Sequence, residues 1–185
     1  MYVALLCCRP NDILDFWFHQ DNQAFWFVQN DDFDRTISQQ FYETWTKAIE
    51  GELYHWRTTL QGRLAEIIVL DQFSRNLHRQ SKEAFAYDLT ALVLAQEAIN
   101  QPDFASLNPS ERHFMLMPLM HSESADIHHK AVALFEALGN PKALDFELQH
   151  KAIIDRFGRY PHRNAVLGRD STPDELEFLK SHSGF

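Results

Sequence analysis

Apolar residues recur along this chain at intervals of three and four positions, the spacing of a helix with one buried face. The alternation of apolar and polar residues that indicates strands does not recur in the same way. Three of the apolar stripes are Phe33, Ile37, Phe41, Trp45 and Ala48; Leu60, Leu64, Ile67 and Ile68; and Phe85, Leu89, Leu92, Val93 and Ile99. The pattern therefore predicts an all-α protein.

Capping residues and helix breakers mark the ends of these helices. The segments 108–111 and 172–175 each place a capping Asn or Thr, a Pro in the first turn and a Glu that reaches back to the cap. Further boundaries are predicted at Asn11 or Asp12, Gly51, Pro102, Gly139 and Pro141. The sum is eight or nine helices joined by short loops, which we expect to pack as antiparallel pairs.

Length and charge narrow the classes of protein. A chain of 185 residues usually forms one domain, and a net charge of −9 argues against sequence-independent nucleic-acid binding, which needs a basic surface. No apolar run approaches the length of a membrane helix, and the N-terminus lacks the features of a signal peptide. The neighbouring Cys7 and Cys8 are expected to be free thiols. We expect a cytoplasmic protein without a membrane partner.

Several ionisable residues stand where the stripes predict apolar ones. Asp71 extends the stripe of residues 60–68, and Arg75 follows four positions later, within reach of a pair inside one helix. Asp88 lies among alanines that let a neighbouring helix come close, and His121, His128 and His150 continue apolar faces. Burial of such groups is unfavourable unless they are paired, so we expect them to meet one another or a ligand between helices.

A second feature is the segment 156–169, which carries four arginines and one histidine and no acidic residue. Its glycines and proline predict a loop for most of its length. Arginines on a loop can hold a carboxylate or phosphate through two parallel hydrogen bonds. They can equally cap helix ends and pair with acidic faces, and both interpretations stay open.

Metal binding is the weaker interpretation of the same residues. Glu147 with His150, and Glu52 with His55, have the Glu-x-x-His spacing of di-iron helical bundles. However, Glu52 follows a helix-ending glycine, and further inward-facing glutamates are lacking apart from Glu123. We therefore predict no metal site, and the sequence names no cofactor.

These segments also resemble a known, mainly bacterial family, the domain of unknown function 924 family. The resemblance rests on the segments 12–18, 70–76, 121–123, 156–164 and 167–179, and it covers nearly the whole chain from Asn11 to Phe185. It implies an all-helical, tetratricopeptide-like right-handed array and no particular activity. Residues 1–10 fall outside the pattern and are expected to be an N-terminal extension of a single helical domain over residues 11–185.

The leading hypothesis is a polar pocket that binds a small anionic molecule. The candidate acids and bases are His121, His150, His162, Asp71 and Glu123. The candidate ligand-binding residues, which include further members of the family motifs, are Gln72, Arg75, Asn76, Arg159, Arg163 and Asn164. If the protein is an enzyme, hydrolysis or group transfer on a phosphate or carboxylate ester is the expected class.

Two other functions stay open at this point. A tetratricopeptide-like groove could hold a peptide carboxylate, which would make the protein an interaction module. Alternatively, the motifs could only join loops to helix ends and have a structural role. The sequence does not decide between an enzyme and a binding protein.

Overall fold

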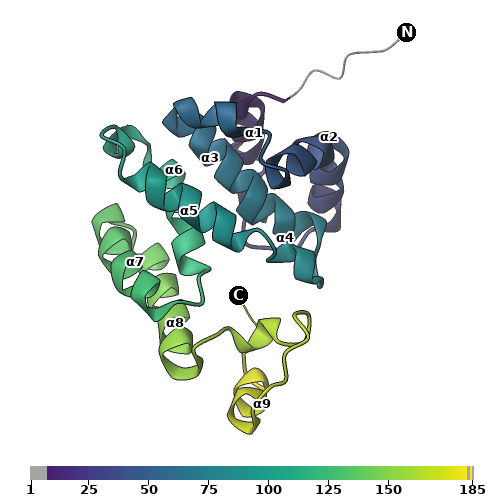
Figure 1. Ribbon diagram of the computed structural model, residues 1–185, viewed down its shortest axis with the longest axis vertical. Coiled ribbons are helices and arrows are strands. Elements are labelled where there is room, and N and C mark those ends of the chain that lie inside the picture. The colour runs from purple at the N-terminus through teal and green to yellow at the C-terminus, as the bar shows by residue number, and fades with distance from the viewer. Residues whose placement is uncertain (1–7, 183, 185) are drawn as a thin grey trace.

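A computed structural model describes residues 8–182 and 184. Within these residues the chain forms helices and turns and no strand, which confirms the all-α prediction (Figure 1). The helices are α1 (Pro10–Trp17), α2 (Asp31–Ile49), α3 (Leu60–Ile68), α4 (Ser74–Leu77), α5 (Asp88–Ile99), α6 (Pro109–Met120), α7 (Ala125–Leu138), α8 (Pro141–Phe157) and α9 (Pro173–Leu179). A π-helical turn, Val69–Phe73, joins α3 to α4 in one rod, so the described part of the chain holds eight separate helices.

The helices pack mainly against their neighbours in sequence. α5 packs on α6, α6 on α7 and α7 on α8, while α3 lies at the centre and contacts α1, α5 and α6. Two residues connect α7 to α8, and the two helices form a hairpin at the lower left of Figure 1. Helices that follow one another in the chain therefore pack together, as the short predicted loops indicated.

Aromatic residues fill the core between α1, α2 and the rod of α3 and α4. The ring of Phe16 stacks on Phe33 at 5.5 Å between centroids, and Trp17 meets Phe114 edge to face at 5.4 Å. Phe73 lies 5.3 Å from Phe41 in the same cluster. Trp17 thus belongs to the core, and Phe16, Phe18, Phe25 and Trp26 pack against it.

The predicted caps of α6 and α9 are confirmed. Asn108 accepts a hydrogen bond from the backbone N–H of Glu111, whose carboxylate accepts one from the backbone of Asn108. Thr172 and Glu175 form the same reciprocal pair at α9. The cap predicted for α1 at Asn11 or Asp12 is wrong, because the helix begins earlier, at Pro10, which suits the first turn.

The stripe predicted for residues 85–99 is also wrong in part. α5 begins only at Asp88, and its buried face consists of alanines, Ala91, Ala95 and Ala98, with Leu92 and Leu94 beside them. Leu89 and Val93 are instead 71% and 48% exposed. Alanines allow α5 to lie close to α3 and α6, and this close packing turns the larger side chains outward.

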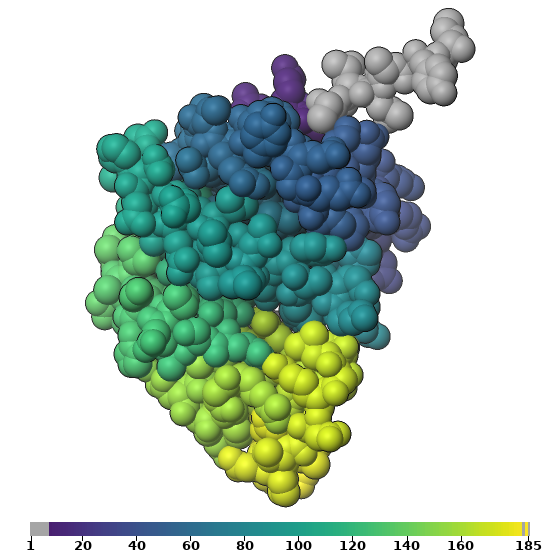
Figure 2. Space-filling view, in the orientation of Figure 1, coloured from purple at the N-terminus to yellow at the C-terminus, as the bar shows by residue number. Residues whose placement is uncertain are grey.

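The chain after α8 forms a separate small layer. Gly158, at a φ of 68°, ends α8, and residues 159–172 run as a loop with one 3₁₀ turn at Pro161–Arg163 before α9. Tyr160 is buried there with Ile153 and Ile154. Figure 2 shows this segment, in yellow, in the lower part of the molecule against α8 and below the rod of α3 and α4.

Two expectations concern the ends and the surroundings of the chain. Of the predicted extension over residues 1–10, residues 1–7 lie outside the described residues, while Pro10 already belongs to α1. None of the helices in the described residues is both long enough and apolar enough to cross a membrane.

Candidate functional site

The site is built around the π-helical turn that interrupts the rod of α3 and α4. All five residues of the turn, Val69–Phe73, are buried, and the side chain of Asp71 is 1% exposed. A π turn inserts one extra residue into a helix and changes the direction of the side chains that follow. Here it places a carboxylate inside the core, opposite the end of α6.

Asp71 forms a dyad with His121, the residue at which α6 ends. Its Oδ1 lies 2.7 Å from Nδ1 of His121, and its Oδ2 accepts a hydrogen bond of 2.5 Å from Gln72. Burial opposes the charge on Asp71, but Arg75 and His121 hold the pKa of this carboxyl far below its ordinary value. Burial, and then Arg75, lowers the pKa of His121. The neutral ring therefore donates from Nδ1 to Asp71 and carries its lone pair on Nε2.

Asp88, the first residue of α5, joins two arginines from distant parts of the chain. Arg75 donates to both carboxylate oxygens, at 2.9 and 3.0 Å, and also to the backbone oxygen of Asp71 at 2.7 Å. Arg163, from the loop after α8, donates from Nη1 to Asp88 at 3.2 Å. Asp88 thus connects the central rod with the C-terminal segment.

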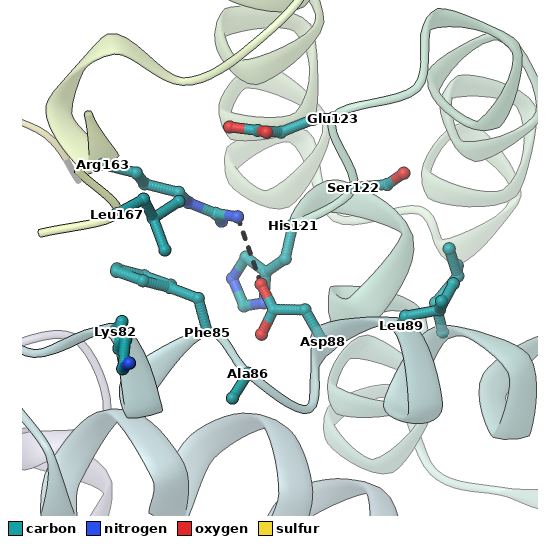
Figure 3. Close-up of a pocket in the computed structure, with 11 residues that line it drawn as sticks. Lys82, Phe85, Ala86, Asp88, Leu89, His121, Ser122, Glu123, Arg163 and Leu167 are labelled. Atoms are coloured by element: carbon teal, nitrogen blue, oxygen red, sulfur yellow. Dashed lines mark hydrogen bonds and ion pairs between the residues drawn. The ribbon is translucent and has the colours of Figure 1, made fainter. Parts of the chain in front are cut away.

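A pocket of about 300 Å³ opens at this junction (Figure 3). It is lined by Lys82, Phe85, Ala86, Asp88, Leu89, Leu92, His121, Ser122, Glu123, Arg163 and Leu167. Lysine and arginine balance aspartate and glutamate among these residues, so neutral His121 leaves the lining without net formal charge. The volume is at the lower end of the range for small-molecule sites.

Nε2 of His121 and Nη2 of Arg163 have hydrogen-bonding capacity left on this lining. Nε2 of His121 has no hydrogen-bond partner among the described residues, because Asp71 engages only Nδ1. Among the same residues, Arg163 has Asp88 as its sole acceptor, through Nη1. Its Nε is buried without a partner, so Nη2 is the donor left for a ligand. The rings of Phe85 and Tyr160 each lie 4.6 Å from the guanidinium carbon of Arg163.

Glu123 lines the same pocket but is already paired. Its oxygens accept hydrogen bonds from Arg169, at 2.7 and 3.0 Å, and from the backbone N–H of Tyr160 at 2.8 Å. Burial opposes its charge, but these donors lower the pKa of Glu123. The carboxylate ties the end of α6 to the C-terminal loop.

Other members of the predicted site lie in a separate network at α9. Arg159 donates to both oxygens of Glu175, at 2.6 and 2.8 Å, and to the backbone oxygen of Asp170. Asn164 donates to Ser171 at 3.0 Å. None of these residues lines the pocket, and their contacts hold the loop onto the start of α9.

The remaining predicted residues also lie apart from the pocket. Asn76 donates to Asp34 of α2 at 2.7 Å. His150 has its Nδ1 2.7 Å from the backbone oxygen of Phe146, and its ring packs 5.7 Å from that of Tyr160. His162 lies 5.6 Å from the same ring on another side. Burial lowers the pKa of His150 to about 3 and that of His162 to about 4.

The structure thus divides the predicted site. His121, Arg163 and Glu123 line the pocket. Asp71, Gln72 and Arg75 lie behind this lining, where Asp71 bonds to His121 and Arg75 bonds to Asp88. His150, His162, Asn76, Arg159 and Asn164 do not reach it. The sequence hypothesis required Asp71, His121 and His150 to converge with the arginine segment. His121 lines the pocket with Arg163 and is bonded to Asp71, whereas His150 contacts that segment at Tyr160, away from the pocket.

Sequence reasoning left Lys82, Phe85 and Leu167 out of the site, and it treated Asp88 only as a buried charge. Asp88 had a usable signal, since an acidic residue begins a helix whose next turns are rich in alanine. Lys82 and Phe85 lie before α5, and the sequence analysis placed Phe85 in the apolar stripe of the helix itself. Leu167 carries no local signal, because it reaches the pocket only through the path of the loop.

A buried His–Glu pair lies next to the pocket. Nδ1 of His128 is 2.7 Å from Glu147, and its Nε2 is 2.9 Å from the backbone oxygen of Ser122. Burial raises the pKa of Glu147. The hydroxyl of Tyr160 donates to the backbone of Met120 at 2.5 Å beside this pair. These bonds fix α7 and α8 to the end of α6.

The spacing that suggested a metal does not bring its residues together. Glu147 faces His128, while Nδ1 of His150 lies beside the backbone of its own helix. Across the described residues there is no group of three or more His, Cys, Asp or Glu side chains with a geometry that could hold a metal ion.

Fold and site together define an all-helical protein in which a buried Asp–His dyad and an aspartate shared by two arginines adjoin a small pocket. The chain belongs to the family described as bacterial protein of unknown function (DUF924), whose model matches residues 13–183. Its structure is similar to that of a protein of unknown function from Agrobacterium tumefaciens, with 32% identity and a TM-score of 0.88. The similarity covers 94% of this chain and 97% of that one. A comparison with curated proteins gave no match.

Proposed function

We propose that the pocket binds a small molecule that carries an anionic group, with His121 as its proton acceptor. The observation that carries this proposal is the presence of two unused polar groups on one lining, Nε2 of His121 and Nη2 of Arg163. An unused acceptor and an unused donor at one pocket favour a ligand that supplies the partners.

Arg163 is the anion-binding residue that the geometry favours among the predicted arginines. Arg75 already donates to Asp71 and to both oxygens of Asp88, and Arg159 is engaged with Glu175. Lys82 adds a second positive charge to the pocket lining. Asp88 holds Arg163 through Nη1 alone, which leaves Nη2 as a charged donor for a ligand.

The dyad extends the proposal from binding to catalysis. Asp71 orients the ring of His121 and stabilises the imidazolium that forms when Nε2 takes a proton. In the hydrolysis of a carboxylate ester, Nε2 would take a proton from water as the water oxygen bonds to the carbonyl carbon. The imidazolium would then return this proton to the departing alkoxide, so that an acid and an alcohol leave. Ester hydrolysis, or transfer of the same acyl group to an alcohol, is the reaction class that we propose.

The binding proposal is tested by titration with defined anions. Sodium acetate, sodium butanoate and inorganic phosphate are added to protein labelled with ¹⁵N while the ring nitrogens of His121 are followed by NMR. We expect saturable shifts of Nε2. The variant Arg163→Lys keeps a charge opposite Asp88 but lacks the Nη2 donor, and it should bind at least about tenfold more weakly.

Arg35→Lys, on the exposed surface of α2, is the matched control and should leave the titration unchanged. If none of the three anions shifts the His121 signals, the pocket does not bind anions and the proposal is wrong. Hydrolysis is tested separately with p-nitrophenyl acetate and butanoate. His121→Gln should abolish turnover, and equal turnover in this variant would contradict the catalytic part alone.

A specific observation favours a structural role for the rest of the motif. Arg159 and Arg169 each grip a carboxylate in bidentate fashion, and Asn164 bonds to the same loop. These residues hold the C-terminal segment in place. We propose that they support the pocket from outside and do not bind its ligand.

A further inference from the structure

The pocket has an apolar side that continues onto the outer surface of α5. Phe85, Ala86, Leu89, Leu92 and Leu167 contribute to its lining. Leu89 lies at one end of the lining in Figure 3 and Arg163 at the other, with His121 between them. A ligand that satisfies Arg163 therefore has an apolar wall within reach.

Leu89 and Val93 carry this apolar side out of the pocket. They stand four positions apart on α5, on one face of the helix, and are 71% and 48% exposed. One helical turn separates them, roughly 5–6 Å along the axis. Exposed leucine and valine in adjoining turns beside a polar pocket form a short apolar track that begins where the pocket ends.

The charges around the pocket favour one negative charge on the ligand over two. Lys82 and Arg163 are balanced by Asp88 and Glu123, so the lining has no net formal charge. Nη2 of Arg163 can donate to a single carboxylate, whereas a phosphate dianion would add a second charge close to Asp88 and Glu123.

We infer that the ligand is a straight-chain aliphatic monocarboxylate, the acid that the proposed hydrolysis releases. This inference rests on the proposed function of the same pocket. The carboxylate lies on Arg163 near His121, the first methylene groups contact Phe85 and Leu92, and the rest of the chain follows Leu89 and Val93. The track beyond the pocket has room for about four methylene groups at the rise of one helical turn.

Calorimetric titration with butanoate, hexanoate and octanoate tests the inference. Each added methylene should strengthen binding by roughly twofold on this half-exposed track, against roughly fourfold for complete burial. 1-Hexanol, which has the chain without the charge, should bind at least about tenfold more weakly than hexanoate because it has no charge to pair with Nη2 of Arg163.

The variant Val93→Gln shortens the track without touching the core or the pocket lining. It should bind butanoate as the wild type does and lose most of the gain from hexanoate to octanoate. Leu148→Gln replaces a comparably exposed side chain on α8 and should keep that gain.

The outcomes separate this inference from the proposed function. Anion binding that depends on Arg163 but is the same for butanoate and octanoate would overturn the aliphatic ligand and leave the anion site standing. Stronger binding of octyl phosphate than of octanoate would overturn the single negative charge. If no anion of any length binds, the proposed function itself fails.

Discussion

Asp71 is a carboxylate in the core, and three neighbouring polar side chains stabilise its negative charge. It receives hydrogen bonds from His121 and Gln72, and Nη1 of Arg75 lies 3.0 Å from its Oδ1. A buried charge without partners is strongly unfavourable, so these three side chains act as one unit. The same unit fixes the tautomer of His121, the property on which the proposed chemistry depends.

The dyad makes a prediction about the protonation of His121. Long-range ¹H–¹⁵N NMR at pH 7 should show a neutral ring with the proton on Nδ1, and its pKa should lie below the ordinary value of about 6.5. In Asp71→Asn the pKa should fall further, because the neighbouring negative charge that favours imidazolium is lost. A ring that titrates at an ordinary pH with no change in Asp71→Asn would contradict the dyad.

Removal of this charge should also destabilise the fold. Asp71→Asn leaves Arg75 with one buried partner fewer, and the breaking of a buried pair typically costs about 3 kcal/mol. Urea denaturation at pH 7 measures the change. Asp12→Asn, which removes an exposed pairing at the start of α1, is the matched control, and its effect should be much smaller.

One buried and two half-buried histidines predict a loss of stability in mild acid. The folded state lowers the pKa of His150 to about 3 and those of His113 and His162 to about 4, chiefly through burial. Below about pH 6.5 these histidines bind protons in the unfolded chain but not in the folded chain. The free energy of unfolding should therefore fall from pH 7 towards pH 4. Each histidine contributes about 1.4 kcal/mol per pH unit in that range.

Urea denaturation at pH 7, 6 and 5 follows this loss. His150→Gln should have a shallower dependence on pH than the wild type, because one of the three uncharged rings is gone. Glu147, whose pKa burial raises, acts in the opposite sense and reduces the slope without reversing it. Equal stability at pH 7 and pH 5 would contradict the burial of these rings.

Among the elements, the start of α3 depends on one glycine. A Cβ on Gly62 would lie 1.9 Å from the backbone oxygen of Trp56, in the 3₁₀ turn Tyr54–Thr58. Gly62→Ala should therefore displace that turn and destabilise the fold by about 2–3 kcal/mol, as overpacked core positions do.

Gly139→Ala is the matched control for this change. Its Cβ would meet nothing within 4 Å, and only the positive φ of 72° opposes it, at about 1 kcal/mol. Thermal or urea denaturation compares the two variants. Equal losses of stability in the two variants would contradict the close contact between Gly62 and the backbone of Trp56.

Helix ends were the elements most accessible from sequence. The caps at Asn108 and Thr172 and the stop at Gly139 depend on bonds within four residues, and the structure confirms all three. The buried face of α5 was not accessible in this way. Both its leucines and its alanines follow helical spacing, and only the distance to α3 and α6 decides which set turns inward.

The π turn likewise has no local signature. Residues 69–73 continue the apolar stripe in the sequence, and in the structure the wider turn lies where Asp71 contacts His121. The turn thus accompanies a contact between residues 50 positions apart in the chain. The helix propensities of the individual residues do not depend on such a distant contact, so they could not predict the turn.

On the scale of the whole molecule, Asp88 and Arg163 join the central rod to the C-terminal segment, across the region between α5 and the loop before α9 in Figure 1. A double-mutant cycle of Asp88→Ala and Arg163→Met, read by urea denaturation, should give a coupling of about 1–3 kcal/mol. Asp71 and Arg163 share no hydrogen bond, so Asp71→Asn with Arg163→Met should give clearly less. The reverse order would contradict the role of Asp88 as the link.

The sequence by itself determined the helices, most of their ends and the composition of the motifs, because these follow from interactions within a few residues. It also indicated that polar residues of the rod, α6 and the arginine segment would meet, since buried charges require partners. Only the tertiary structure decided which charges pair. The four arginines at positions 75, 159, 163 and 169 have the same chemistry. Of these four, Arg163 is the one that the path of the loop brings to the pocket with an unused donor, Nη2, while the others are engaged elsewhere.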